Sequence, residues 1–243
     1  MKMIKDNIHS LILAVAGITA AWLIGNGFKR KPHGEYVSVT GMAEVNFTSD
    51  EIRWSGDFSR SSAEMKEAYQ SLKTDKDKVF QYFKSKGVHD SEMVFGTVNI
   101  EKQYEDYRED GVYRTVFKGY KASQSIKIHS RRIDAIESVV KESMELIENG
   151  IEFNAGAPEF YYTRLSDLKL ELIRKAAADA GSRAEKIAEA SNCSLGALKS
   201  SDLGVFQITG ENDNEEYSWG GVFNTSSKRK TARVTVSSNF ATH

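Results

Sequence analysis

Residues 36–47 read Tyr-Val-Ser-Val-Thr-Gly-Met-Ala-Glu-Val-Asn-Phe, and apolar and polar side chains alternate through this stretch. The small and apolar positions share one face and are Val37, Val39, Gly41, Ala43, Val45 and Phe47. The opposite face carries Ser38, Thr40, Glu44 and Asn46. A period of two is typical of a strand with one buried face. The stretch therefore predicts a half-buried β-strand that opens a folded domain.

The residues that follow predict a second strand and a helix. Past the turn at 48–50, alternate positions carry Ile52, Trp54, Gly56 and Phe58. Ser61 or Ser62 is then expected to cap a helix, because a serine side chain can accept a hydrogen bond from the first helical turn. Apolar residues recur at helical spacing at Met65, Ala68, Tyr69, Leu72, Val79, Phe80 and Phe83. Gly87 is expected to end this helix, one stripe of which faces a sheet.

A β-hairpin is predicted next. Residues 93–107 and 112–129 are both rich in strand-forming side chains, and Asp110-Gly111 lies between them. Asp-Gly between two such runs is a strong hairpin signal. We expect the turn at residues 108–111, with the tip exposed to solvent.

The second half of the chain continues the pattern. A helix is expected from Ile133 through Ile136, Val140, Met144 and Ile147 to Gly150. A strand at 151–162 is broken by Gly156-Ala157-Pro158, and strands near 203–209 and 231–240 end the domain. The longest helix, 166–192, begins with Ser166 as its cap and has a narrow stripe formed by Leu168, Leu172, Ala176, Ala180, Ala184 and Ala188. Hairpins require antiparallel neighbours. The fold is therefore expected to be α+β, with one mixed, mainly antiparallel sheet and about three packed helices.

An apolar run precedes this domain. Residues 8–28 follow Lys2 and Lys5 and lead into Lys29-Arg30-Lys31. A basic start and an apolar run are typical of an export signal, and the run approaches the roughly 20 residues that a bilayer core requires. Residues 1–31 are therefore predicted to be a signal or membrane-anchor segment. Retention as an anchor is favoured, because no clean Ala-x-Ala cleavage motif is present; cleavage is the alternative.

The charge and the cysteine content of the chain argue against a nucleic-acid partner and exclude an intramolecular disulfide. The chain has 33 basic and 34 acidic residues, and removing residues 1–31 leaves five more acidic than basic side chains. Nucleic acid is therefore not expected as a partner, because phosphate binding needs a basic surface. Cys193 is the single cysteine, so no intramolecular disulfide can form.

Catalytic and ligand motifs give weak signals. Ser-x-x-Lys occurs at Ser138 and at Ser166, but no Ser-Asp-Asn element accompanies it. The histidines lack metal-ligand spacing, and the glycines form no phosphate-binding loop. We therefore expect no catalytic residues, no metal and no cofactor. The alternative is an exported enzyme or small-ligand-binding protein whose site is assembled from residues distant in sequence.

The hairpin supplies the candidate interaction surface. Tyr104, Tyr107 and Tyr113 lie on it together with Arg108, among several acidic residues. Aromatic side chains and arginine are enriched at protein interfaces. These four residues are predicted to contact a partner, with simple cross-strand pairing as the alternative.

Several short motifs, in order, resemble the SIMPL-domain family of bacterial periplasmic and outer-membrane-associated proteins. Residues 37–43, Val-Ser-Val-Thr-Gly-Met-Ala, are similar to the family's opening strand, and 87–93 to its helix-ending segment. Residues 119–124 resemble its Gly-Tyr-x-Ala strand, and the Ala-rich helix at 176–190 precedes Leu195-Gly196. The resemblance covers residues 35–243, assigned as one SIMPL-like domain, and departs from the family's Pro-Asp turn at 48–51.

The resemblance implies a non-enzymatic protein of the cell envelope that binds partners and oligomerises. We expect a homo-oligomer with its domain on the periplasmic side, anchored in the inner membrane through residues 8–28. If the segment is cleaved, the protein is instead periplasmic or outer-membrane-associated. The sequence identifies no other partner.

Overall fold

The computed structural model describes residues 17–22, 35–109, 111–212, 216 and 218–243. The chain forms two compact units. The larger comprises Met42–Ala177 and Leu203–Val236, and the smaller comprises the residues up to Gly41 with Ala178–Asp202 and Ser237–His243. The order of elements is β1(Tyr36–Thr48), β2(Glu51–Ser62), α2(Met65–Ser85), η1(Asp90–Glu92), β3(Met93–Phe95), β4(Asn99–Glu109), β5(Val112–Ser130), α3(Ile133–Glu142), α4(Glu145–Glu148), β6(Glu152–Ala155), β7(Glu159–Tyr161), α5(Leu165–Ala190), β8(Leu195–Leu203), β9(Gln207–Gly210), β10(Val222–Phe223) and β11(Arg229–Thr242).

The mixed α+β class is confirmed, but the strands form two sheets where one was predicted. The first sheet has five strands in the order β1-β11-β9-β10, with β8 also paired to β11. The second has six strands in the order β3-β5-β2-β6, with β4 on β5 and β7 on β2. Strand β9 pairs with β10 in parallel, whereas β2 and β5 pair antiparallel along their length. Alternation identifies a buried face but does not say which strands pair, so the number of sheets did not follow from it.

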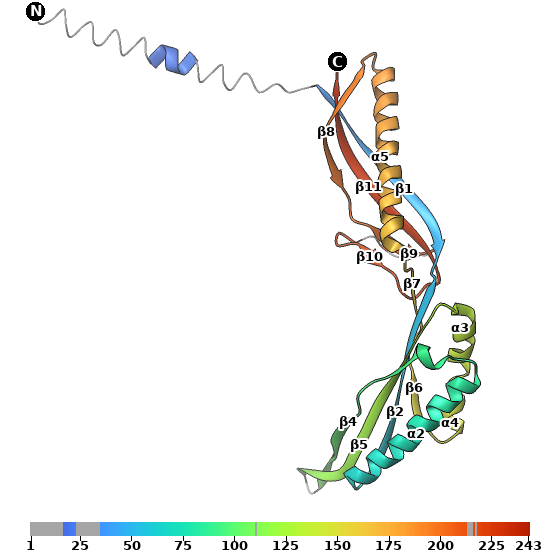
Figure 1. Cartoon of the computed structure of the whole chain (residues 1–243). Helices are drawn as coiled ribbons and strands as arrows, with labels where there is room; N and C mark the ends of the chain where they lie inside the picture. The colour runs from blue at the N-terminus through green and yellow to red at the C-terminus, as the bar shows by residue number, and fades with distance from the viewer. Residues whose placement is uncertain (1–16, 23–34, 110, 213–215, 217) are drawn as a thin grey trace, which may run out of the picture. The chain divides into compact units, whose positions relative to one another are not determined.

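The six-stranded sheet carries the main core of the larger unit. Helix α2 lies along β2 and β5 (Figure 1), and the buried side chains Leu72, Val79 and Phe83 pack against Trp54 and Phe58. The predicted stripe is therefore confirmed in its centre. Met65 and Tyr69 are exposed instead, because Met65 is the first residue of α2 and Tyr69 lies at the edge of the stripe.

The small-residue stripe of α5 is buried as predicted, from Leu168 to Ala188. In the larger unit Leu172 and Ala176 contact Ala232 and Val234 of β11. In the smaller unit Ala180 and Ala184 pack against Val39. Small side chains allow a helix to lie close to the strands that it covers.

Several local predictions were wrong. Ser62 is the last residue of β2, and Glu64 is the N-cap of α2 without a side-chain cap hydrogen bond. Ser166 lies inside α5, which begins at Leu165. The helix expected over 133–150 is divided at Ser143, and Met144 and Ile147 are exposed while Leu146 is buried. Strand β8 was not predicted.

The N-terminal prediction mostly lies outside the described residues. Of the segment 8–28, only residues 17–22 are described, and they are helical. Within the described residues, no helix is both long enough and apolar enough to cross a membrane.

Candidate interaction surface

The predicted hairpin extends beyond the strand that flanks it. Strand β2 ends at Ser62, opposite Tyr120 of β5. Residues 112–117 and Gly119 of β5 pair with β4, and in the described part of the chain β2 does not reach them. We call residues 104–118 the arm; it lies at the β4–β5 end of the sheet (Figure 1). A two-stranded ribbon is marginally stable by itself, so its base must fix its geometry.

A β-bulge lies at the base of the arm. The register shifts between Gln103 and Tyr104, so that Gln103 pairs with Gly119 and Tyr104 pairs with Phe117. Gly119 has φ of +128°, and a Cβ atom there would lie 2.3 Å from the carbonyl oxygen of Ser62. Only glycine fits this conformation and this close approach.

The cross-strand register distributes the four predicted residues over two faces. Tyr104 is opposite Phe117, and Arg108 is opposite Tyr113. Directly opposed residues share a face, and positions four apart on a strand do so as well. Tyr104, Arg108 and Tyr113 therefore lie on one face of the arm, and Tyr107 lies on the other, opposite Arg114.

The shared face is aromatic and exposed. The rings of Tyr104 and Phe117 are 5.7 Å apart, and the Arg108 guanidinium lies 5.6 Å from the centre of the Tyr113 ring. Tyr104 is 58% exposed and Tyr113 is 78% exposed. The aromatic side chains thus pair across the strands and also remain accessible to a partner. Phe117 was not among the residues predicted from the sequence. Pairing the two strands outward from the Asp110-Gly111 turn places it opposite Tyr104 and so on the same face.

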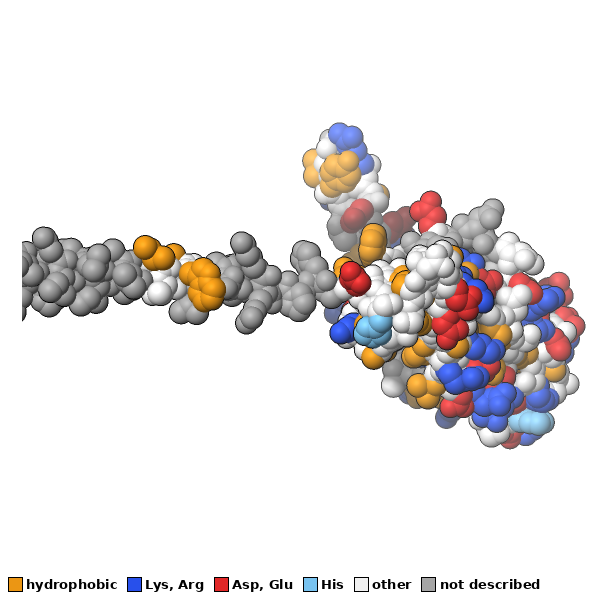
Figure 2. Space-filling view, turned by 90° about the horizontal axis from the view of Figure 1, so that it is seen from above, with side chains coloured by type: hydrophobic (Ala, Val, Ile, Leu, Met, Phe, Trp, Pro, Cys, Tyr) orange, Lys and Arg blue, Asp and Glu red, His pale blue; other side chains and the backbone are white. Residues whose placement is uncertain are grey.

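Two carboxylates of the arm are engaged by neighbouring side chains. Lys118 Nζ is 2.6 Å from Glu105 Oε2, and this hydrogen bond raises the pKa of the Lys118 ammonium. Thr115 donates a hydrogen bond to Asp106. Figure 2 shows that basic and acidic side chains are also mixed on the face of the molecule drawn there. The carboxylates of Glu105 and Asp106 are thus engaged within the arm, while the aromatic side chains stay exposed.

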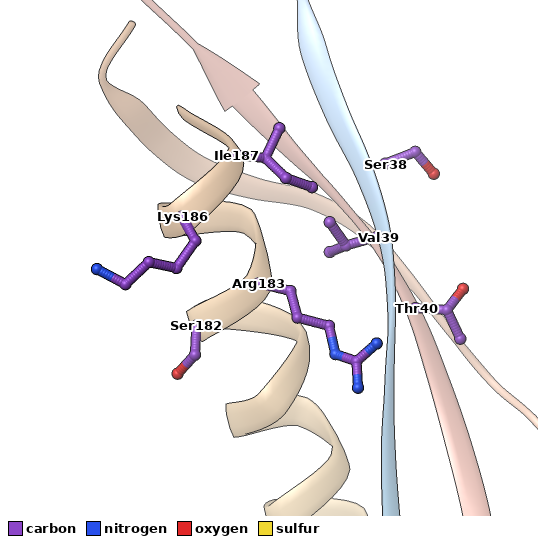
Figure 3. A pocket seen from close by; sticks show the side chains of 7 residues that line it. All are labelled: Ser38, Val39, Thr40, Ser182, Arg183, Lys186 and Ile187. Carbon is purple, nitrogen blue, oxygen red and sulfur yellow. The ribbon is translucent and has the colours of Figure 1, made fainter. Parts of the chain in front are cut away.

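Two further hollows offer space for a ligand. In the smaller unit, a groove of about 570 Å³ lies between β1 and α5. Figure 3 shows that Val39, Arg183 and Ile187 point toward it, whereas Ser38 and Thr40 point away from α5. Arg183 pairs with Asp179 at 2.8 Å and Lys186 pairs with Glu189 at 2.8 Å. The cations of this groove are thus engaged within α5.

The second hollow is a polar niche of about 420 Å³ on the six-stranded sheet, lined by residues that include Arg53, Lys127, His129 and Tyr161. Arg53 is held by Glu51 at 2.6 Å and stacks 4.3 Å from the Tyr161 ring centre. Burial, then the hydrogen bond with Glu159, raises the pKa of Tyr161. Among the described residues, no group of three or more His, Cys, Asp or Glu side chains is placed to hold a metal ion.

Comparison with known proteins identifies the family. Residues 37–239 match the family described as "SIMPL: Protein of unknown function (DUF541)". The chain belongs to the SIMPL family. It is also similar to the "Uncharacterized protein YggE" of Edwardsiella ictaluri (strain 93-146), with 22% identity over 189 residues, 76% of this chain and 75% of that protein. The family resemblance drawn from the strand and helix motifs is confirmed.

Proposed function

We propose that this SIMPL-family protein acts without catalysis, by binding other protein molecules, and that it binds copies of itself through the arm. The observation that carries the proposal is the accessible aromatic face formed by Tyr104, Tyr113 and Phe117. Exposed aromatic side chains on a two-stranded ribbon favour association. The pairing of Glu105 with Lys118 limits repulsion between neighbouring arms.

The proposal includes a location in the cell envelope. Residues 8–28 would anchor the chain in the inner membrane, with the folded domain on the periplasmic side. Support comes from the apolar run between two basic segments. A domain held at a membrane surface has a raised local concentration, which favours weak self-association.

Replacing Tyr104, Tyr107 and Tyr113 with Ser tests the proposal. The full chain would be purified in detergent and its protein mass measured by light scattering, with the detergent contribution subtracted. We expect the unaltered chain to exceed its monomer mass of 27.2 kDa, and the triple variant to shift toward that mass, because its main apolar contacts are lost.

The matched control is Tyr69→Ser, which removes an exposed tyrosine from α2 outside the arm. Circular dichroism would verify that each variant remains folded. An unaltered chain that stays monomeric at high concentration, or a triple variant with unchanged mass, would contradict self-association through the arm.

A further inference from the structure

The polar niche on the six-stranded sheet lies where the chain beside β2 is interrupted. Strands β6 and β7 pair with two separate stretches of β2, and residues 156–158 connect them. The Gly156 amide donates to the Ser55 carbonyl at 2.9 Å, and the Trp54 indole donates to the Gly156 carbonyl at 2.8 Å. A Cβ atom on Gly156 would lie 2.7 Å from the Ser55 carbonyl oxygen. This wall of the niche is therefore fixed, which lowers the entropic cost of binding.

One side of the niche has hydrogen-bond donors that the protein does not use. Lys127 and His129 lie two positions apart on β5 and so share a face of the sheet, and Ser55 of β2 lies opposite Lys127. All three residues line the niche and are exposed. Within the described part of the chain, their side chains form no hydrogen bond or ion pair. They can therefore donate to a carboxylate of a ligand.

The other side of the niche has a carboxylate. Glu159 of β7 lies opposite Arg53 of β2, which in turn lies opposite His129. The Tyr161 hydroxyl donates to Glu159 Oε2 at 3.0 Å. Glu159 Oε1 accepts no hydrogen bond from the residues that the structure describes. It can therefore accept one from an ammonium group of a ligand.

Arg53 lies between these two sides, and its charge is balanced within the protein. Its Nε donates to Glu51 at 2.6 Å, and its guanidinium lies 4.3 Å from the centre of the Tyr161 ring. Arginine has five N–H donors. The Nη groups bind none of the described residues, so they can donate to a neutral acceptor such as a peptide carbonyl.

The spacing of the strands indicates the length of the ligand. Lys127 and His129 lie on β5, Glu159 lies on β7, and β2 runs between them. Neighbouring strands are about 4.8 Å apart, so β5 and β7 are about 10 Å apart. The two ends of an extended dipeptide are roughly 7 Å apart, and the long side chains of Lys127 and Glu159 can reach over the remaining distance. The volume of about 420 Å³ is in the range of small-molecule sites.

We infer that the polar niche binds a dipeptide with free ends. Lys127, His129 and Ser55 bind its carboxylate. Glu159 binds its ammonium group, and Arg53 donates to its peptide carbonyl. A simple anion would lie near Glu159 and a simple cation near Lys127, so a ligand with both charges fits the niche better. The niche includes no residue of the arm, so this inference does not depend on the proposed self-association.

Isothermal titration calorimetry on the full chain in detergent tests the inference. The probes are alanylalanine, its N-acetyl form, its C-terminal amide and free alanine. We expect alanylalanine to bind about 10-fold more tightly than either blocked form, because each block removes one charge-assisted contact. Equal binding of all three dipeptides, tighter binding of free alanine, or no binding of alanylalanine at millimolar concentrations would overturn the inference.

Two variants assign the two ends of the ligand. Lys127→Gln with His129→Gln should bind alanylalanine about 10-fold more weakly and lose its preference over the amide, while keeping its preference over the N-acetyl form. Glu159→Gln should lose the opposite preference, and its amide oxygen can still accept from Tyr161. The matched control is Lys199→Gln, an exposed lysine of β8 outside the niche, which should bind as the unaltered chain does. Because the changed side chains are exposed, all variants should keep the unfolding midpoint. Any result other than this reciprocal loss would overturn the assignment.

Discussion

Glu92 joins three elements through one carboxylate. It accepts hydrogen bonds from the Ser130 hydroxyl at 2.6 Å, from the His89 amide at 2.9 Å and from the Arg132 guanidinium. Burial raises the pKa of Glu92, but the bonds from Arg132, Ser130 and His89 outweigh it and lower this pKa to about 2. The ionised carboxylate therefore fastens η1 to the end of β5 and the start of α3.

This shift predicts how stability depends on pH. A glutamate with an ordinary pKa near 4.5 in the unfolded chain and about 2 in the folded chain stabilises the fold above pH 4.5. The contribution is lost as pH falls through the folded value. We expect Glu92→Gln to lower the free energy of unfolding by about 2 kcal/mol at pH 7, with a smaller difference at pH 3.5. Urea unfolding at both pH values measures it.

Glu148→Gln is the matched control, because Glu148 is exposed at the end of α4. It should leave the unfolding free energy almost unchanged at both pH values. A loss in Glu92→Gln that is equal at pH 7 and pH 3.5 would show that packing, rather than charge, holds η1 in place.

Single residues also show what the sequence can and cannot predict. Burial of Val39, Gly41 and Ala43 followed from alternation alone. Asp75 is buried in the stripe of α2, where it binds Arg60 of β2, which also donates to the Gly150 carbonyl at 2.5 Å. A buried carboxylate requires such a partner. Helical spacing gave no sign of it, because the partners come from other elements.

Whole elements were predictable where one face is apolar. The β4–β5 hairpin was confirmed, because Gly111 has φ of +82° and allows the turn that Asp-Gly indicates. Strand β8 was missed because most of its side chains are exposed, so it has no apolar period. Its pairing with β11 holds it in the sheet. Likewise, the sequence located the arm but not the bulge at its base, where the register shifts so that Gln103 pairs with Gly119.

The bulge predicts that two glycines of the same hairpin differ in how much a substitution by alanine destabilises the fold. Gly119→Ala would place Cβ 2.3 Å from the Ser62 carbonyl oxygen and 3.1 Å from the Ala63 Cα, at φ of +128°. We expect it to lower the free energy of unfolding by about 3 kcal/mol, since backbone strain and a clash add. Gly111→Ala meets nothing within 4 Å at φ of +82° and should cost about 1 kcal/mol. Urea unfolding of both variants measures the difference, and equal losses would contradict this account of the bulge.

For the molecule as a whole, the two compact units were not evident from the sequence. The chain changes from one unit to the other within β1, α5, β8 and β11, at Gly41, Ala177, Asp202 and Val236. Continuous strands and a continuous helix carry no linker composition that would mark a boundary.

The location of the molecule gives the last prediction. If residues 8–28 export and anchor the chain, the folded domain lies outside the inner membrane. Protease added to spheroplasts should then digest the domain of the unaltered chain, while a cytoplasmic marker protein stays intact. A domain protected in intact spheroplasts but digested after lysis would contradict the periplasmic location.

Two variants of the apolar run make this test specific. Leu13→Arg with Val15→Arg places two charges in the run, which is costly in a bilayer core. We expect that variant to remain inside the spheroplasts and to be protected from the protease. The matched control, Leu13→Ile with Val15→Leu, keeps the run apolar and should behave as the unaltered chain does. N-terminal sequencing distinguishes the two fates of the segment, because a retained anchor begins before residue 8 and a cleaved signal leaves a new terminus near Phe28.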